Sequence, residues 1–310
     1  MEKVTILGVP LNLGSRNLEV GMGPNAFRHQ NLLEKLTYAG FTVTDAGNIE
    51  CKYREHLKVG NHKLRYLDEI LRVSEESAKQ TFQLVQKGEK VVALGGDHSL
   101  CLGVISGASI ALNGEIGLIY LDAHGDMNTT ETTLTGNIHG MPLSALLGFG
   151  DKNLVNVFKP TRKISKENML HVGGNDFDQG ELALIEKENL QCFKIIDMLS
   201  DGFKPLFEHI NKLSKKVKNI WVSLDLDVID EMHAPGVGMP NKAGLTYREI
   251  TTIADYIGKH CNVVGVDIDE YNPPTDIDGK TAELGIEFIA KVLGGSYGWY
   301  AGYIEKNKIQ

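Results

Sequence analysis

Histidine and aspartate side chains gather in this 310-residue chain where three short apolar runs end. The runs cover residues 91–94, 116–121 and 220–224. Six residues follow them, namely His98, Asp122, His124, Asp126, Asp225 and Asp227. In an open α/β sheet, ligands bind beyond the carboxyl ends of the strands. If the three runs are neighbouring parallel strands, we expect these six side chains to converge on one point.

The spacing within two of the groups supports this convergence. Asp122, His124 and Asp126 are separated by two residues each, and Asp225 and Asp227 repeat that spacing. Alternate residues of an extended chain project to the same side, so each group would present its polar atoms together. A single strand-end aspartate is more often a helix cap or a turn residue. Six such residues at these spacings favour a functional site.

Four converging carboxylates repel one another strongly unless cations offset their charge. Two divalent cations would balance the four aspartates, which favours a two-metal centre over a one-metal centre. The oxygen and imidazole donors, without thiolate, suit Mn²⁺, and also Zn²⁺, Fe²⁺ or Co²⁺. Two such ions can share a water, lower its pKa and produce a hydroxide near neutral pH.

The elements that must position these residues follow an alternating pattern. Apolar, β-branched runs predict eight strands, and helical spacing of apolar residues separates them, which is typical of an α/β domain with a mostly parallel sheet. The runs are 4–10, 41–45, 90–94, 116–121, 169–172, 192–196, 220–225 and 263–267. The helical patterns are 24–39, 67–85, 206–217, 247–257 and 282–293. No linker-like stretch divides the chain, so we predict a single domain over residues 1–310.

Composition excludes several classes of protein. The 32 basic and 40 acidic residues give a net charge of −8, which argues against a nucleic-acid binder with a broad basic surface. No apolar run approaches the length of about 18 residues that a membrane span needs. The four cysteines are scattered and form no disulfide framework, and no secretion signal opens the chain. We therefore expect a cytoplasmic protein.

Several long motifs resemble the ureohydrolase family of arginases and agmatinases. They are LGVPLNLG at 7–14, GGDHS at 95–99, DAHGDMN at 122–128, SLDLDVID at 223–230 and APGVG at 234–238. The resemblance implies a three-layer αβα sandwich and two Mn²⁺ per subunit. It assigns one ion to His98, Asp122, Asp126 and Asp225. It assigns the other to Asp122, His124, Asp225 and Asp227, so that Asp122 and Asp225 bridge.

The segment 128–142 resembles the substrate loop of arginases. By this resemblance, the residues that bind the α-carboxylate of a free amino acid are Asn128, Thr135 and Asn137. Asp178 and Glu181 would face the α-amino group, Glu270 would pair with the guanidinium, and His139 would shuttle protons. The implied reaction is hydrolysis of L-arginine to L-ornithine and urea by a metal-bridging hydroxide, with Asp126 moving its proton. Asn128, Asn137 and Asp178 also fit turn or helix-cap roles.

Some positions depart from the arginase pattern and keep alternatives open. Thr135 stands where most arginases have serine, and Met239 stands where the family usually has threonine. The sequence DVIDEMHAPG also resembles formimidoylglutamases. Agmatinase, guanidinobutyrase and formimidoylglutamase activities thus remain alternatives, as does a non-catalytic relative that binds metal or arginine. The resemblance further implies a trimer or hexamer, with Arg248 and Glu249 at a position involved in subunit contacts.

Overall fold

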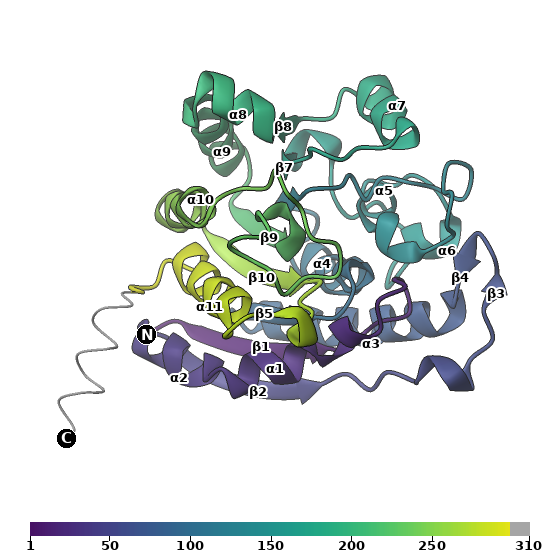
Figure 1. Ribbon diagram of the computed structural model, residues 1–310, viewed down its shortest axis with the longest axis horizontal. Helices are drawn as coiled ribbons and strands as arrows, with labels where there is room; N and C mark the ends of the chain where they lie inside the picture. The colour runs from purple at the N-terminus through teal and green to yellow at the C-terminus, as the bar shows by residue number, and fades with distance from the viewer. Residues whose placement is uncertain (298–310) are drawn as a thin grey trace.

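One parallel sheet runs through the protein. The computed structural model describes residues 1–297, and its eight-stranded sheet has the order β2-β1-β5-β10-β9-β6-β7-β8 (Figure 1). Every pair of neighbouring strands in it is parallel. The strands are β1 Lys3–Val9, β2 Thr42–Asn48, β5 Lys90–Gly95, β6 Ile116–Asp122, β7 Met169–Gly173, β8 Cys192–Lys194, β9 Asn219–Asp225 and β10 Val263–Asp269. The short strands β3 (Gly60–Asn61) and β4 (Leu64–Arg65) form a separate hairpin.

Helices cover both faces of this sheet and give it two hydrophobic cores. In β5, Val92 and Leu94 pack into one core, and Val91 and Ala93 pack into the other. The first core is closed by α1 Gly23–His29, α2 Leu32–Tyr38, α8 Ile195–Asp201, α9 Lys204–Lys216, α10 Tyr247–His260 and α11 Lys280–Val292. The second is closed by α3 Leu67–Gln86, α4 Cys101–Ala111, α5 Pro142–Leu146, α6 Lys152–Val155 and α7 Gln179–Glu188. This arrangement confirms the α/β fold and its three layers.

The eight strands that the sequence predicts are all present, but two local predictions are wrong. The run 192–196 is shorter as a strand, because the Asp197 carboxylate accepts the backbone N–H of Lys194 and closes the first turn of α8. The helical pattern 24–39 is two helices, because Asn31 adopts a left-handed φ of 60° between them. Among the described residues, no helix combines the length and apolar character that a membrane span needs.

The strand order brings the polar strand ends together. The strands β5, β10, β9 and β6 are consecutive neighbours in the sheet, although they are far apart in the sequence. In register, Asp269 at the end of β10 pairs with Asp225 at the end of β9. Because all four strands are parallel, their carboxyl ends lie at one edge, and polar residues that follow them share one location.

Close packing between β10 and β9 predicts a strong effect of one added methyl group. A Cβ atom at Gly265 would overlap the ring of Trp221, which is fully buried. We expect Gly265→Ala to lower the free energy of unfolding by about 1–3 kcal/mol, since the packed ring has no free space to move into. Urea unfolding monitored by circular dichroism measures this change. Gly140→Ala, whose added Cβ meets no atom within 4 Å, is the control, and equal losses in both variants would contradict the packing argument.

Candidate metal centre

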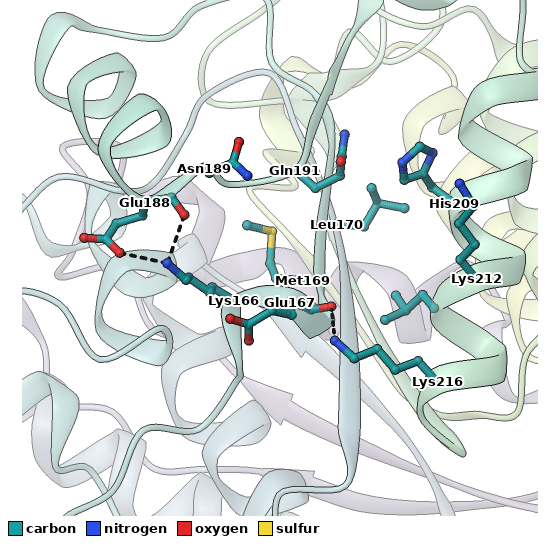
Figure 2. A pocket seen from close by; sticks show the side chains of 11 residues that line it. Lys166, Glu167, Met169, Leu170, Glu188, Asn189, Gln191, His209, Lys212 and Lys216 are labelled. Carbon is teal, nitrogen blue, oxygen red and sulfur yellow. Dashed lines mark hydrogen bonds and ion pairs between the residues drawn. The ribbon is translucent and has the colours of Figure 1, made fainter.

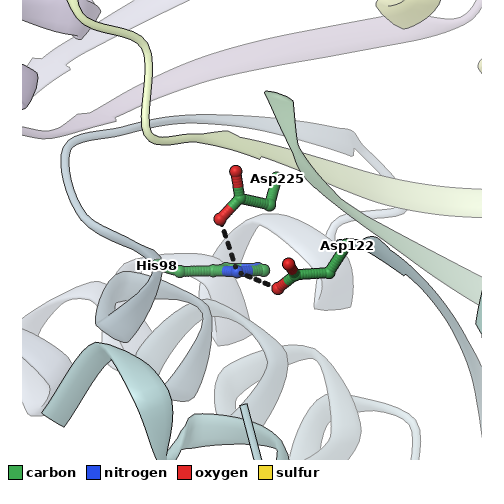
Figure 3. Close-up of side chains that lie close together, drawn as sticks. All are labelled: His98, Asp122 and Asp225. Atoms are coloured by element: carbon green, nitrogen blue, oxygen red, sulfur yellow. Dashed lines mark hydrogen bonds and ion pairs between the residues drawn. The ribbon is translucent and has the colours of Figure 1, made fainter. Parts of the chain in front are cut away.

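His98 forms the centre of the first group of predicted ligands. It begins a 3-10 turn just after β5, and its fully buried ring stacks on Tyr120 with centroids 4.6 Å apart. Its Nδ1 atom lies 3.0 Å from Asp126 Oδ2, 3.1 Å from Asp122 Oδ2 and 3.4 Å from Asp225 Oδ2. Figure 3 shows the ring edge of His98 pointing between the carboxylates of Asp122 and Asp225. Three strand ends thus meet at one imidazole nitrogen.

His124 gathers a second group beside the first. Its Nδ1 atom lies 3.1 Å from Asp227 Oδ2 and 3.5 Å from Asp122 Oδ1. The two carboxylate oxygens of Asp122 therefore face different histidines, one in each group. Ligand atoms of His98, Asp122 and Asp225 all lie within 4.8 Å of one another, and so do those of Asp122, His124 and Asp227. The structure brings all six sequence-predicted ligands together, in two clusters that share Asp122.

Turns, rather than an extended chain, produce this convergence, so the spacing argument is wrong in its geometry. Strand β6 ends at Asp122, whose Oδ1 accepts the backbone N–H of His124 at 2.7 Å. Asp126 has a left-handed φ of 52°. Asp225 likewise accepts the N–H of Asp227 at 2.9 Å and opens a 3-10 turn. Each strand-end aspartate caps its own turn, and the turn carries the next ligand back toward it.

The buried carboxylates shift one another's protonation. Burial, together with the neighbouring aspartates, raises the pKa of Asp225 well above its usual range. Burial also raises the pKa of Asp227 to about 6, although His124 opposes the rise. For Asp122, burial alone would raise the pKa, but hydrogen bonds from His124 and His98 hold it below its usual value. The site therefore attracts positive charge, and protons and metal ions compete for it.

The donor set fits a pair of divalent cations. It offers carboxylate oxygen and imidazole nitrogen without thiolate, which is a set that Mn²⁺ and similar ions bind. Asp227 Oδ1 is buried and has no hydrogen-bond partner among the residues that the structure describes. Such an orphaned buried oxygen is costly unless a cation or a proton meets it. Four carboxylates against two imidazoles leave an excess of negative charge that two divalent ions would balance.

A chain of hydrogen bonds behind His98 fixes which ring nitrogen faces the carboxylates. The Ser223 hydroxyl donates to Asp267, which also accepts the indole N–H of Trp221. Because that hydroxyl has only one hydrogen, its 3.0 Å contact with His98 Nε2 is donated by the ring N–H. His98 Nδ1, which faces the carboxylates, is therefore the nitrogen from which a metal ion would displace a proton. Sequence reasoning missed Ser223 and Asp267, which lie inside strands β9 and β10 rather than after them.

Two further groups that the sequence did not indicate hold the ligands in place. The Tyr120 hydroxyl donates to Asp126 Oδ2 at 2.8 Å from within the apolar strand β6. The buried ring of His171 contacts the backbone carbonyl of His124 through Nε2, at 2.7 Å. Burial lowers the pKa of His171 to about 4, so the ring is neutral and Nε2–H is the donor. Neither residue stands in a polar motif, so no sequence signal pointed to them.

The predicted proton shuttle and the predicted guanidinium ligand are neighbours. His139 Nδ1 lies 3.3 Å from Glu270 Oε1, which also accepts the backbone N–H of His98 at 3.1 Å. Burial disfavours a charged His139, but Glu270 outweighs it and raises the pKa of His139 to about 9. Glu270 adopts a φ of 59°, and its Oε2 lies beside Gly238, next to the half-exposed Met239.

The residues predicted to bind an amino acid form two groups, and several already have hydrogen-bond partners. Asn128 donates through Nδ2 to Asp178 Oδ2 at 2.7 Å. Asp178 and Glu181 form a capping box at the start of α7, and the buried Glu181 also accepts the N–H of Met127. Burial raises the pKa of Glu181 to about 7. The Thr135 hydroxyl accepts the backbone N–H of Asn137 at 3.1 Å.

A separate pocket lies away from the predicted metal centre and is lined by other residues. It lies between the start of β7 and helix α9 (Figure 2). Its volume is about 350 Å³. Two of its lysines already have partners, because Lys166 pairs with Glu188 and Lys216 donates to the carbonyl of Glu167. It contains none of the predicted site residues and lies at the opposite ends of the strands from them.

The fold and the site together define an α/β protein with two buried carboxylate–histidine clusters at the strand ends, consistent with a binuclear metal site. Residues 2–294 match the Arginase family. An arginase of Brevibacillus brevis is 36% identical over 295 residues, which are 94% of this chain and 98% of that relative. The chain belongs to the arginase family and is a ureohydrolase-family metallohydrolase.

Solved structures of related proteins agree with this assignment. The native structure of arginase from Bacillus caldovelox is 34% identical and has a TM-score of 0.91, over 96% of this chain and all 100% of that one. Arginase from Entamoeba histolytica in complex with L-ornithine is 29% identical and has a TM-score of 0.85, over 94% of this chain and 99% of that one. The family match over residues 2–294 includes every strand of the sheet and every predicted site residue.

Loss of one predicted ligand should remove one of the two metal ions and leave the other bound. Asp227 contacts His124 and lies in only one of them, so we expect Asp227→Asn to lower the metal content of the protein from two ions per chain to one. Metal analysis after equilibrium dialysis against Mn²⁺ measures the stoichiometry. Asp230→Asn is the matched control, because Asp230 follows the same strand but accepts the backbone N–H of Met232 instead. Retention of two ions by Asp227→Asn would remove Asp227 from the ligand set.

Proposed function

We propose that this protein hydrolyses L-arginine to L-ornithine and urea with two Mn²⁺ per subunit. The observation that carries the proposal is the pair of clusters that share Asp122, with His139 and Glu270 beside them. Homology to arginases over nearly the whole chain supports it. Assembly as a homo-oligomer and a cytoplasmic location remain predictions from the sequence.

Asp126 is placed to move the proton of the attacking water. When bound, divalent cations would lower the pKa of a bound water and supply hydroxide near neutral pH. Asp126 is buried at this point, and Tyr120 holds one of its oxygens. Burial and the neighbouring Asp122 raise the pKa of Asp126. A carboxylate with a raised pKa can accept a proton and later release it to the departing δ-nitrogen.

Glu270 and His139 are placed for the cationic end of the substrate and for proton exchange. A guanidinium keeps its charge at pH 7 because its pKa exceeds about 12, so it needs a carboxylate partner. Glu270 Oε2 has no hydrogen-bond partner among the described residues, while Oε1 faces His139 and the backbone of His98. His139 keeps nearly a quarter of its side chain exposed, at 23%, so it can exchange protons with solvent.

The amino acid end of the substrate would meet amide, hydroxyl and carboxylate groups. We assign the α-carboxylate to Asn128, Thr135 and Asn137, and the α-amino group to Asp178 and Glu181. The Asn128 and Asp178 side chains are joined by a hydrogen bond. Donors for a carboxylate therefore lie beside acceptors for an ammonium, which suits a free amino acid. Glu181 is buried behind Asp178 and would act through a water or through Asp178.

A panel of substrates tests the proposal. The Mn²⁺-loaded protein is incubated separately with L-arginine, agmatine, guanidinobutyrate and formiminoglutamate, and urea or formamide is measured. We expect the highest kcat/KM for L-arginine, since agmatine lacks the carboxylate for which Asn128 and its neighbours offer donors. A preference for another compound would assign that activity instead. Binding of L-arginine without turnover at saturating Mn²⁺ would identify a non-catalytic relative.

His139→Ala tests the assigned proton path. His139 contacts Glu270 rather than the metal-ligand carboxylates, so we expect this variant to keep two Mn²⁺ per chain while kcat falls by about 10²–10⁴-fold. Urea release and metal analysis on the same preparation measure both quantities. His209→Ala, which changes a histidine on helix α9, is the control for loss of an imidazole. Loss of metal from His139→Ala would place His139 among the ligands.

A further inference from the structure

Asp269 is a buried carboxyl group that the proposed reaction does not use. It ends strand β10, it is 0% exposed, and neither of its oxygens has a hydrogen-bond partner among the residues that the structure describes. Unsatisfied buried carboxyl groups are rare because their desolvation is not offset. Such a carboxyl group beside the predicted metal centre is therefore a candidate for a functional role.

The structure makes room for this carboxyl group. A Cβ atom at Gly95 would overlap Asp269 Oδ1, so only glycine at that position leaves space for the side chain. Gly95 ends strand β5, three residues before His98. The same loop therefore presents the histidine and accommodates the carboxyl group behind it.

Asp269 faces the ring edge of His98 that points away from the ligand carboxylates. Its Oδ2 atom lies 3.5 Å from His98 Nε2, and the Ser223 oxygen lies 3.0 Å from the same nitrogen. The Nε2–H bond is thus directed into a region with two oxygen acceptors. Asp267, two residues earlier, already accepts hydrogen bonds from Trp221 and Ser223, whereas both oxygens of Asp269 lack a hydrogen-bond donor among the described residues.

A third metal ion in this place fits the chemistry less well. Ligand atoms of His98, Asp267 and Asp269 do lie within 4.8 Å of one another. A cation there would need Nε2 of His98 without its hydrogen, while Nδ1 of the same ring faces the first cluster. Because Nε2 donates a hydrogen bond to the Ser223 oxygen, this nitrogen carries a hydrogen and cannot bind a cation. Asp269 is therefore better placed as a partner of the N–H group.

We propose that Asp269 is a positioning residue for the metal ligand His98. Its carboxylate attracts the Nε2–H group, holds the ring with Nδ1 toward Asp122 and Asp225, and makes Nδ1 a stronger donor. Carboxylates behind ligating histidines commonly orient the ring and raise its basicity. This inference rests on the proposed two-metal centre, and it predicts an effect on the ion bound by His98 but not on the ion bound by His124.

Substitution of Asp269 tests the proposal through metal binding rather than through activity. Mn²⁺ is titrated calorimetrically into the metal-free unaltered protein, Asp269→Leu and Asp269→Asn. We expect Asp269→Leu to weaken one of the two sites by about 10–100-fold and to leave the other unchanged. Asp269→Asn keeps an acceptor without the charge, so its loss should be smaller. At Mn²⁺ concentrations that give the coupled two-ion electron paramagnetic resonance signal in the unaltered protein, Asp269→Leu should show an uncoupled single-ion signal.

Thermal unfolding of the metal-free proteins separates positioning from a structural role. Asp269→Leu removes an unsatisfied buried carboxyl group, so we expect its midpoint to stay equal or rise while metal affinity falls. Glu69→Gln is the control, because Glu69 is a buried carboxylate that is paired with Arg72 away from the site. It should lower the midpoint and leave both metal affinities unchanged.

Unchanged Mn²⁺ affinities in both Asp269→Leu and Asp269→Asn would overturn the proposal. Equal weakening of both metal sites together with a lower unfolding midpoint would show a structural role instead, which also overturns it. So would three bound ions in the unaltered protein against two in the variants. The last result would make Asp269 a ligand itself. Failure of the unaltered protein to bind an Mn²⁺ pair would refute the proposed metal centre, and the role of Asp269 with it. A bound pair with unchanged variants would refute the role of Asp269 alone.

Discussion

The repulsion among four aspartates buried at one edge of the sheet is the constraint on which the rest of the structure depends. Asp122, Asp126, Asp225 and Asp227 are almost fully withdrawn from solvent. Like charges at such distances raise one another's pKa and favour protonation, separation or the binding of cations. The strands beneath them are packed on both faces, so the carboxylates cannot separate without disruption of two cores. Protons or metal ions must therefore offset the negative charge of the four carboxylates.

Hydrogen bonds around the four carboxylates stabilise that arrangement. Asp122 and Asp225 each accept a backbone N–H two residues further on, so each aspartate stabilises the turn that carries the next predicted ligand. Tyr120 fixes Asp126, and Ser223 fixes the ring of His98. Glu270 and His139 lie just outside, where a cationic substrate would find a carboxylate that the metal ions do not neutralise.

Much of this was predictable from the sequence, and the exceptions have physical causes. The strands were predicted because a sheet covered on both faces needs apolar runs without interruption. Helix α4 was not predicted, because nine of its eleven residues, from Cys101 to Ser109, are buried and no polar face marks its period. The convergence of the six residues was predicted from their types and positions, but the turns that bring them together include a left-handed backbone at Asp126. Tyr120 and Ser223 were not predicted as site residues, because an isolated polar residue in an apolar strand cannot be distinguished by sequence from a residue of the core.

The central claim is that two metal ions occupy two clusters that share Asp122. Anomalous diffraction at the manganese absorption edge, on crystals of the Mn²⁺-loaded protein, tests it most directly. The account predicts two peaks, one between His98 Nδ1 and the carboxylates of Asp122 and Asp225, the other among Asp122, His124 and Asp227. A single peak, or a peak at His98 Nε2 beside Asp267 and Asp269, would contradict it.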